Sequence, residues 1–168
     1  MRQHLINSNF AAPLDSGWQR DTRNYDGRAE LLSLPDGGVS VRKSMCGWAR
    51  LVQVVALPDQ RVTFHTRARF AAQSSRPDYH ASAAVVLGWL SDDGRELGET
   101  RWQLRSPAIA VVSSATKQVI RVEEPGAWLD LELDVAEALR SGLPGIKPDD
   151  VRAVRISYEA FGSGTGGC

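Results

Sequence analysis

The sequence predicts an all-β fold, an antiparallel β-sandwich or barrel, on the basis of three observations. Short stretches alternate apolar and polar residues with a period of two, the pattern of a strand with one buried face. Turn dipeptides stand between them, namely Asp26-Gly27, Asp36-Gly37 and Asp93-Gly94. Many short strands divided by such turns are typical of a sandwich rather than a βαβ fold.

The clearest strand pattern lies between residues 61 and 72. Val62, Phe64 and Phe70 are expected to face one way with Thr66 and Ala68, and Thr63, His65, Arg67 and Arg69 to face the other way. We expect this strand to neighbour the strand at 48–57 through a tight turn at Pro58-Asp59-Gln60. The other expected strands are 5–10, 17–20, 29–34, 38–43, 82–92, 101–105, 118–123, 127–133 and 151–160.

One short inserted helix is expected near 134–141. Asp134 is a suitable N-cap, Glu137 stands three residues later as in a capping box, and Gly142 ends the apolar stripe. With 168 residues and 42% hydrophobic residues, the chain suits one core. We therefore expect a single sandwich domain over 1–168, with a flexible glycine-rich tail at 162–168.

Charge and hydropathy exclude some classes of partner. Twenty basic residues balance twenty acidic ones, which argues against nucleic acid as a partner. No apolar run is long enough to cross a membrane, so no membrane partner is expected. The first ten residues lack the apolar stretch of a secretory signal. The chain either acts inside the cell or was cut from a longer, exported protein, in which case it is extracellular.

Cysteine and histidine give no metal motif. Cys46 and Cys168 could form one bridge, but two free thiols is the favoured interpretation because Cys168 ends the glycine-rich tail. The three histidines are isolated in sequence, so no Cys/His cluster has zinc spacing.

Three segments resemble a known family. They are LINSNFAAPLDSGW (5–18), GWARLVQVVALPDQRVTFHTRAR (47–69) and AAVVLGWLSDDGRELGET (83–100). In this order they resemble the carbohydrate-binding modules found beside cellulases and xylanases, which belong to the galactose-binding-like jelly-roll superfamily. The resemblance implies a noncatalytic module that binds a poly- or oligosaccharide in a groove on one sheet, with a linked catalytic domain as partner.

The chain departs from the family at the structural calcium site. Family members often carry an acidic residue directly after the opening Phe, where this chain has Ala11. An inherited calcium site would therefore rely on backbone carbonyls. Members usually finish with an Asp-bearing strand, and this chain ends where that strand is expected to begin. The exposed edge would then be covered by another chain, which makes a homo-oligomer one expectation.

Sugar sites combine a flat aromatic ring with charged or amide side chains, because sugars present an apolar C–H face and a rim of hydroxyls. Trp102, between two polar residues, is the expected exposed platform, and Trp48 is expected at the groove margin. Trp18 and Trp89 are expected in the core, and Trp128 is expected to be buried under the helix. The complete candidate set is Trp48, Gln53, His65, Arg67, Arg69, Tyr79, Trp102, Arg155 and Glu159.

Other interpretations stay open. The same polar residues would also suit a solvated sheet face whose Arg and Glu pair across strands. A structural or protein-interaction sandwich of a larger assembly, such as a phage particle or a cell surface, would need no sugar. Catalytic motifs are missing from the sequence, and nothing singles out the carboxylate pair that a glycosidase needs. We therefore expect a chain that is not itself an enzyme, and a lyase or hydrolase built on the same sandwich stays open as the third alternative.

Overall fold

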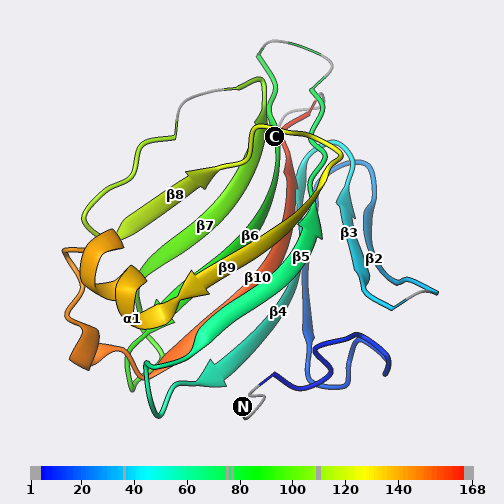
Figure 1. Cartoon of the computed structure of the whole chain (residues 1–168). Coiled ribbons are helices and arrows are strands. Elements are labelled where there is room, and N and C mark those ends of the chain that lie inside the picture. The colour runs from blue at the N-terminus through cyan, green and yellow to red at the C-terminus, as the bar shows by residue number, and fades with distance from the viewer. Residues whose placement is uncertain (1–4, 36, 75, 77, 109–110, 165–168) are drawn as a thin grey trace.

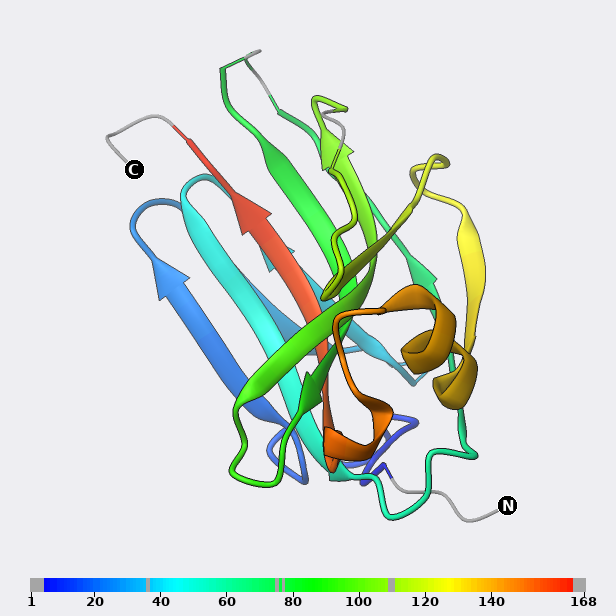
Figure 2. The ribbon, with the colours of Figure 1, turned by 90° about the vertical axis from the view of Figure 1, so that its left-hand side faces the viewer.

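Strand pairing builds two layers in the computed structural model (Figure 1), which describes residues 5–35, 37–74, 76, 78–108 and 111–164. The first layer is a six-stranded sheet in the order β1-β4-β10-β6-β7-β8. Its strands are β1 (Gln19–Asn24), β4 (Gly47–Ala56), β6 (Ala81–Leu90), β7 (Glu96–Ser106), β8 (Lys117–Arg121) and β10 (Ala153–Gly162). Only the β7–β8 pair is parallel. Figure 2 shows this order from β1 in blue through β4 in cyan and β10 in red to the green strands.

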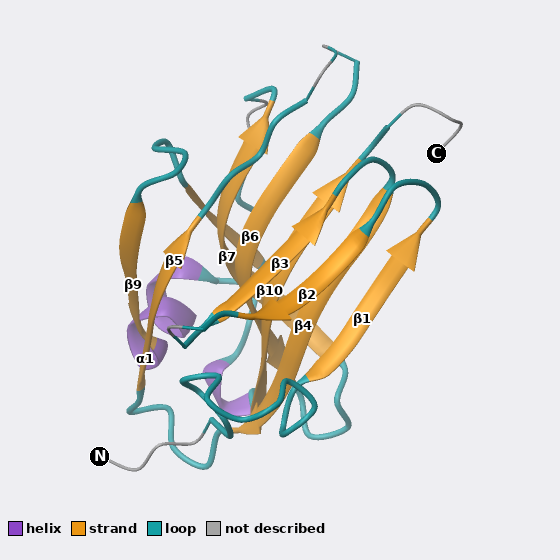
Figure 3. Cartoon of the chain, turned by 90° about the vertical axis from the view of Figure 1, so that its right-hand side faces the viewer, coloured by secondary structure: helices purple, strands orange, loops and turns teal. Residues whose placement is uncertain are grey.

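The second layer consists of two separate pairs of strands. One is the hairpin β2 (Ala29–Ser33) and β3 (Val39–Lys43), and the other is the ribbon β5 (Thr63–Arg69) and β9 (Trp128–Asp134). The hairpin lies across β4 and β10 (Figure 3). The expected all-β sandwich is therefore confirmed.

The core lies between the layers and is filled by alternate side chains of each strand. Leu51, Val85, Leu87 and Trp89 are almost fully buried on the inner side of the large sheet. Phe64 of β5 stacks on Trp102 of β7 with ring centroids 5.9 Å apart, which joins the two layers.

Most of the expected strands are present, but the one at 5–10 is wrong. That segment forms turns, in which Asn7 and Phe10 have φ angles of 51° and 55°. The Asn7 side chain closes the loop, because Nδ2 donates to the Ala12 carbonyl at 3.0 Å and Oδ1 accepts from the Ala12 amide at 3.0 Å. Local side-chain hydrogen bonds of this kind compete with strand pairing.

The expected pairing of the strands at 48–57 and 61–72 is also wrong. Both edges of β4 are already paired, one with β1 and the other with β10. The segment at Pro58-Asp59-Gln60 therefore does not form a hairpin turn but carries the chain to the other layer, where β5 pairs with β9. The prediction of the two faces of β5 is confirmed, because Phe64 and Phe70 are buried and His65, Arg67 and Arg69 are exposed.

The helix begins where the sequence indicates. Asp134 caps α1 (Val135–Glu137), because its Oδ1 accepts from the Glu137 amide at 2.8 Å. A π-helical turn follows, η1 (Ala138–Gly142), and a 3-10 turn, η2 (Pro148–Asp150), precedes β10. Among the described residues, no helix has the length and apolar character that spanning a membrane requires.

The glycine-rich segment is ordered further than expected. Gly162 ends β10, and a side chain there would meet the Met45 carbonyl oxygen at 2.1 Å, so only glycine fits. Ser163 and His80 exchange hydrogen bonds through their backbones and the Ser163 hydroxyl. The rest of the expected flexible tail, 165–168, lies outside the described residues, as does Cys168. Cys46 is disulfide-bonded, so its assignment as a free thiol is wrong.

Phe64→Ala is expected to lower the free energy of unfolding by about 3–5 kcal/mol, because it removes a buried ring that bridges the two layers. Urea denaturation measures this difference. The matched change His65→Ala alters an exposed neighbour on the opposite face and should leave stability nearly unchanged. The reverse result would mean that the two faces of β5 are inverted.

Candidate ligand-binding face

The candidate site is the outer face of the six-stranded sheet, meaning the side turned away from the β2–β3 hairpin and the β5–β9 ribbon. Along β4, Ala49, Leu51 and Gln53 are buried toward the core, so Trp48 and Arg50 point outward. The pairing register carries this orientation across the sheet. Trp48 therefore has Phe161 beside it, and Arg50 has Glu159 beside it.

Charged side chains form a chain of ion pairs across this face. Arg50 of β4 contacts Asp21 of β1 and Glu159 of β10, at 3.5 Å in each case. Arg101 of β7 contacts the other oxygen of Glu159 at 3.1 Å, and also Glu99 at 3.6 Å. Lys117 of β8 completes the chain with a 2.8 Å contact to Glu99. Five of the six strands thus contribute a charge.

The sixth strand, β6, contributes no charge. Its outward positions are Ser82, Ala84, Val86, Gly88 and Leu90, of which Ser82, Ala84 and Gly88 are small. A Cβ at Gly88 would lie 3.1 Å from Arg155 Nη2. Arg155 passes over this glycine and reaches Glu96 of β7, with an N–O distance of 2.6 Å. Small residues on β6 therefore allow arginines on either side to bridge it.

Aromatic rings gather at one end of the outer face. Trp48 Nε1 donates to Asp21 Oδ1 at 3.1 Å, and the guanidinium carbons of Arg23 and Arg50 lie 5.4 and 5.2 Å from its ring centroid. Phe161 keeps 38% of its surface exposed and stacks on His80 with centroids 6.1 Å apart. This end therefore offers the apolar ring of Phe161 near the N–H donors of Arg23 and Arg50. Sequence reasoning did not include Phe161 among the candidate residues.

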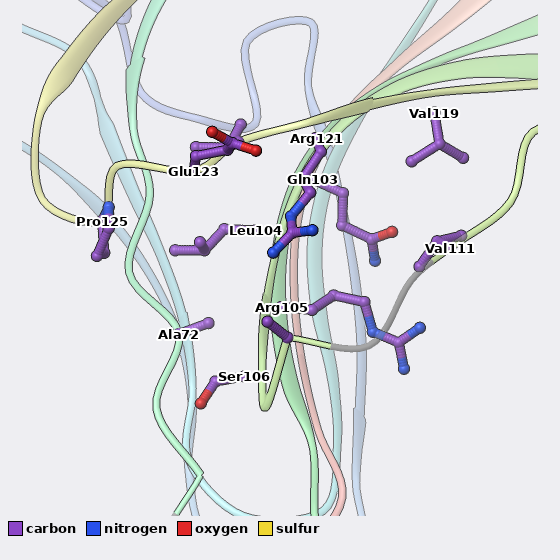
Figure 4. A pocket seen from close by; sticks show the side chains of 12 residues that line it. Ala72, Gln103, Leu104, Arg105, Ser106, Val111, Val119, Arg121, Glu123 and Pro125 are labelled. Carbon is purple, nitrogen blue, oxygen red and sulfur yellow. The ribbon is translucent and has the colours of Figure 1, made fainter.

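A pocket of about 440 Å³ lies beside β7 and β8, at the edge of the sheet away from β1 (Figure 4). Gln103 and Arg105 line it from the outward side of β7, and Leu104 and Ser106 line it from the inward side, so residues of both faces surround the pocket. Arg121 of β8 neighbours Gln103 in the register. Val111 and Val119 add apolar lining. A pocket of this size is within the range of small-ligand sites.

The polar groups of this pocket have unused hydrogen-bonding capacity. Gln103 is only 8% exposed, and its Oε1 atom has no hydrogen-bond partner among the residues that the structure describes. Within the described part of the chain, the Arg105 and Arg121 guanidinium groups have no ion pair or hydrogen bond of their own. Buried polar atoms are almost always satisfied, so the bare Gln103 oxygen marks a place where a ligand can bind. Sequence reasoning missed these three residues, although Gln103 and Arg105 alternate with apolar Trp102 and Leu104.

The residues expected to bind sugar fall into four places. Trp48, Arg155 and Glu159 lie on the outer face, and the latter two are engaged in ion pairs there. His65, Arg67 and Arg69 lie on the exposed side of the β5–β9 ribbon. Tyr79 is half-buried in the loop before β6, where Arg76 Nη1 donates to its hydroxyl at 3.4 Å. Gln53 and Trp102 are buried toward the core.

The expected groove that joins Gln53 to His65, Arg67 and Arg69 is therefore not formed. Gln53 and those three residues belong to different layers. Trp102, expected as an exposed platform, is only 5% exposed. Its polar neighbours Arg101 and Gln103 point outward, so the tryptophan between them must point inward.

The exposed side of the β5–β9 ribbon forms a second aromatic cluster. Trp128 is 51% exposed, and the guanidinium carbons of Arg67 and Arg69 lie 5.5 and 5.3 Å from its ring centroid. His65 Nε2 lies 4.0 Å from Asp130 Oδ1 on the same side. The expectation that Trp128 is buried under the helix is wrong, because Leu129 and Leu131 take the inward positions of β9.

Gln53 has a structural role in the opening loop. Its Oε1 accepts from the Ile6 amide at 3.0 Å, and its Nε2 donates to the carbonyls of Ile6 and Gly17 at 3.0 and 2.7 Å. These bonds tie residues 6–17 to β4. Trp18, buried as expected, donates from Nε1 to the Asn7 carbonyl in the same loop.

No cluster of metal-ligating side chains forms in the described residues, where no three His, Cys, Asp or Glu side chains come together as a metal site. Two carbonyls of the opening loop, those of Ala12 and Pro13, accept from Asn7 Nδ2. A calcium ion that relied on these carbonyls would compete with the asparagine amide.

Comparison with known proteins identifies no relative: no family model matches the chain, and no curated protein matches it.

Gln53→Leu should destabilise the fold by about 1–3 kcal/mol, because backbone groups of Ile6 and Gly17 lose their buried partner. Thermal and urea unfolding report this loss. Gln19→Leu is the control, since Gln19 is an exposed glutamine on β1. Equal stability of the two variants would remove Gln53 from the structural role described above.

Proposed function

We propose that this chain is a noncatalytic carbohydrate-binding module of the jelly-roll, galactose-binding-like kind, and that it holds a glycan on the outer face of the six-stranded sheet. One observation carries the proposal. The exposed ring of Phe161 and the pocket side chains Gln103 and Arg105, which have unused hydrogen-bonding capacity, share this face, with only small side chains between them.

The spacing of these features suits an oligosaccharide. Phe161 is on β10 and Arg105 is on β7, and both pair with Ser82 of β6 in the register. Neighbouring strands lie about 4.8 Å apart, so the two residues are separated by about 10 Å across the sheet. A disaccharide or trisaccharide covers this length. One sugar ring would stack its C–H face on Phe161, and hydroxyls of another would bond to Gln103 and Arg105.

The charges on the face favour binding over hydrolysis. A glycosidase needs one carboxylic acid and one carboxylate across a cleft, and each must be available to the substrate. Glu159 and Glu99 both pair with Arg101, and Glu96 pairs with Arg155. These carboxylates are therefore engaged in ion pairs with arginine. A module of this kind would act by raising the local concentration of a linked catalytic domain at its polysaccharide.

Phe161→Ala should abolish or strongly reduce the retardation of the protein in gels that contain soluble polysaccharides, because it removes the exposed ring of the outer face. Affinity electrophoresis against a panel of neutral and acidic glycans measures this effect. Trp128→Ala is the matched control, since Trp128 is a half-exposed aromatic of the β5–β9 ribbon.

The two variants also separate the two aromatic clusters. Loss of binding in Trp128→Ala alone would move the glycan to the ribbon, where His65, Arg67 and Arg69 lie. A wild-type protein that no glycan retards would contradict the proposed function itself.

A second candidate function is a structural or protein-interaction domain without a sugar ligand. The observation that favours it is β1, whose six side chains are all exposed and which pairs with β4 alone among the described strands. An edge strand of this kind can accept a strand from another chain. Light scattering that shows a stable dimer or larger assembly without glycan would favour this function.

A further inference from the structure

The pocket beside β7 and β8 combines donors and an acceptor that need different partners. Arg105 and Arg121, which are partly or fully exposed, offer only N–H donors, and the acceptor that suits them best is a negatively charged one. The Gln103 oxygen is an acceptor in a buried position, so it needs a donor. A ligand that satisfies the whole pocket must therefore carry an anionic group with a hydroxyl next to it.

We propose that the pocket holds a sugar acid, the uronic acid residue of an acidic polysaccharide. The arginines bind its carboxylate, and Gln103 Oε1 accepts a hydrogen bond from the adjacent ring hydroxyl. Val111 and Val119 contact the apolar side of the ring. This inference rests on the proposed function, because it names the class of glycan that the outer face takes.

Simpler ligands satisfy only part of the pocket. A sulfate or acetate ion would pair with the arginines but would leave the Gln103 oxygen without a donor, since neither ion offers one when ionised. A neutral sugar would satisfy Gln103 but would leave two guanidinium groups without a counter-charge. A sugar acid meets both demands.

The charge that attracts the ligand is local. The chain has a formal net charge of zero at pH 7, so general attraction of a polyanion is weak. Within the pocket lining, two arginines stand against one carboxylate, that of the exposed Glu123. The pocket therefore has a net positive charge, and binding of an anionic glycan should weaken as ionic strength rises.

A matched pair of ligands tests the inference directly. Polygalacturonate, alginate and glucuronoxylan are each compared with their carboxyl-reduced forms in affinity electrophoresis. We expect at least one acidic polymer to bind about tenfold more tightly than its reduced form, the effect of about one charged hydrogen bond. Equal binding of every acidic polymer and its reduced form would overturn the inference and leave the proposed function intact. Failure of all acidic and neutral glycans to bind would overturn both.

Variants assign the effect to the pocket. Arg105→Gln and Arg121→Gln should each remove most of the preference for the acidic polymer, with unchanged melting temperature because neither guanidinium has an ion pair or hydrogen bond among the described residues. Arg20→Gln removes the same charge from an exposed position on β1 and should leave the preference unchanged. Equal loss in all three variants would mean attraction by overall charge and would overturn the pocket as its source.

Gln103→Met separately tests the proposed hydrogen bond from the ring hydroxyl of the ligand to Gln103. It keeps the length of the side chain but removes its amide oxygen, so the advantage of free galacturonate over acetate as a competitor should disappear. Retention of that advantage would show that the pocket recognises a bare carboxylate rather than a sugar acid.

Discussion

The position of β10 in the middle of the six-stranded sheet is the constraint on which the rest of the molecule depends. Its backbone pairs with β4 on one edge and with β6 on the other, so its side chains can point only inward or outward. The inward set includes Val154 and Ile156, which belong to the core. The outward set includes Glu159 and Phe161. One strand thus supplies both the packing that stabilises the sandwich and the groups that shape its outer face.

The outer face shows how a sheet can carry many charges without a second layer above it. Each carboxylate on it lies beside an arginine or lysine, and the small side chains of β6 give Arg101 and Arg155 room to cross to their partners. Ion pairs of this kind stabilise little by themselves, but they hold side chains in fixed positions. Against that fixed background, the groups of Gln103, Arg105 and Arg121 that have no partner in the described part of the chain stand out.

The sequence predicts what depends on neighbouring residues. Period-two alternation locates most strands and the two faces of β5, and Asp134 with Glu137 locates the start of α1. Pairing between distant segments is different, because a strand's own residues say which face is apolar but not which sheet it joins. The sequence therefore could not predict that β4 and β5 lie in different layers, and the groove built on their pairing was wrong. The inward direction of Trp102 and the outward direction of Trp128 were predictable, since the neighbours of each residue already indicate which way its ring points.

Backbone amide mapping by NMR tests the central claim most directly, namely that the glycan lies on the outer face of the six-stranded sheet. An oligosaccharide that binds in gels is titrated into 15N-labelled protein. The account predicts chemical-shift changes that cluster at 48–50, 82–84, 103–105, 119–121 and 159–161, which neighbour one another across the sheet. Changes confined to 63–69 and 128–132, on the β5–β9 ribbon, would contradict it.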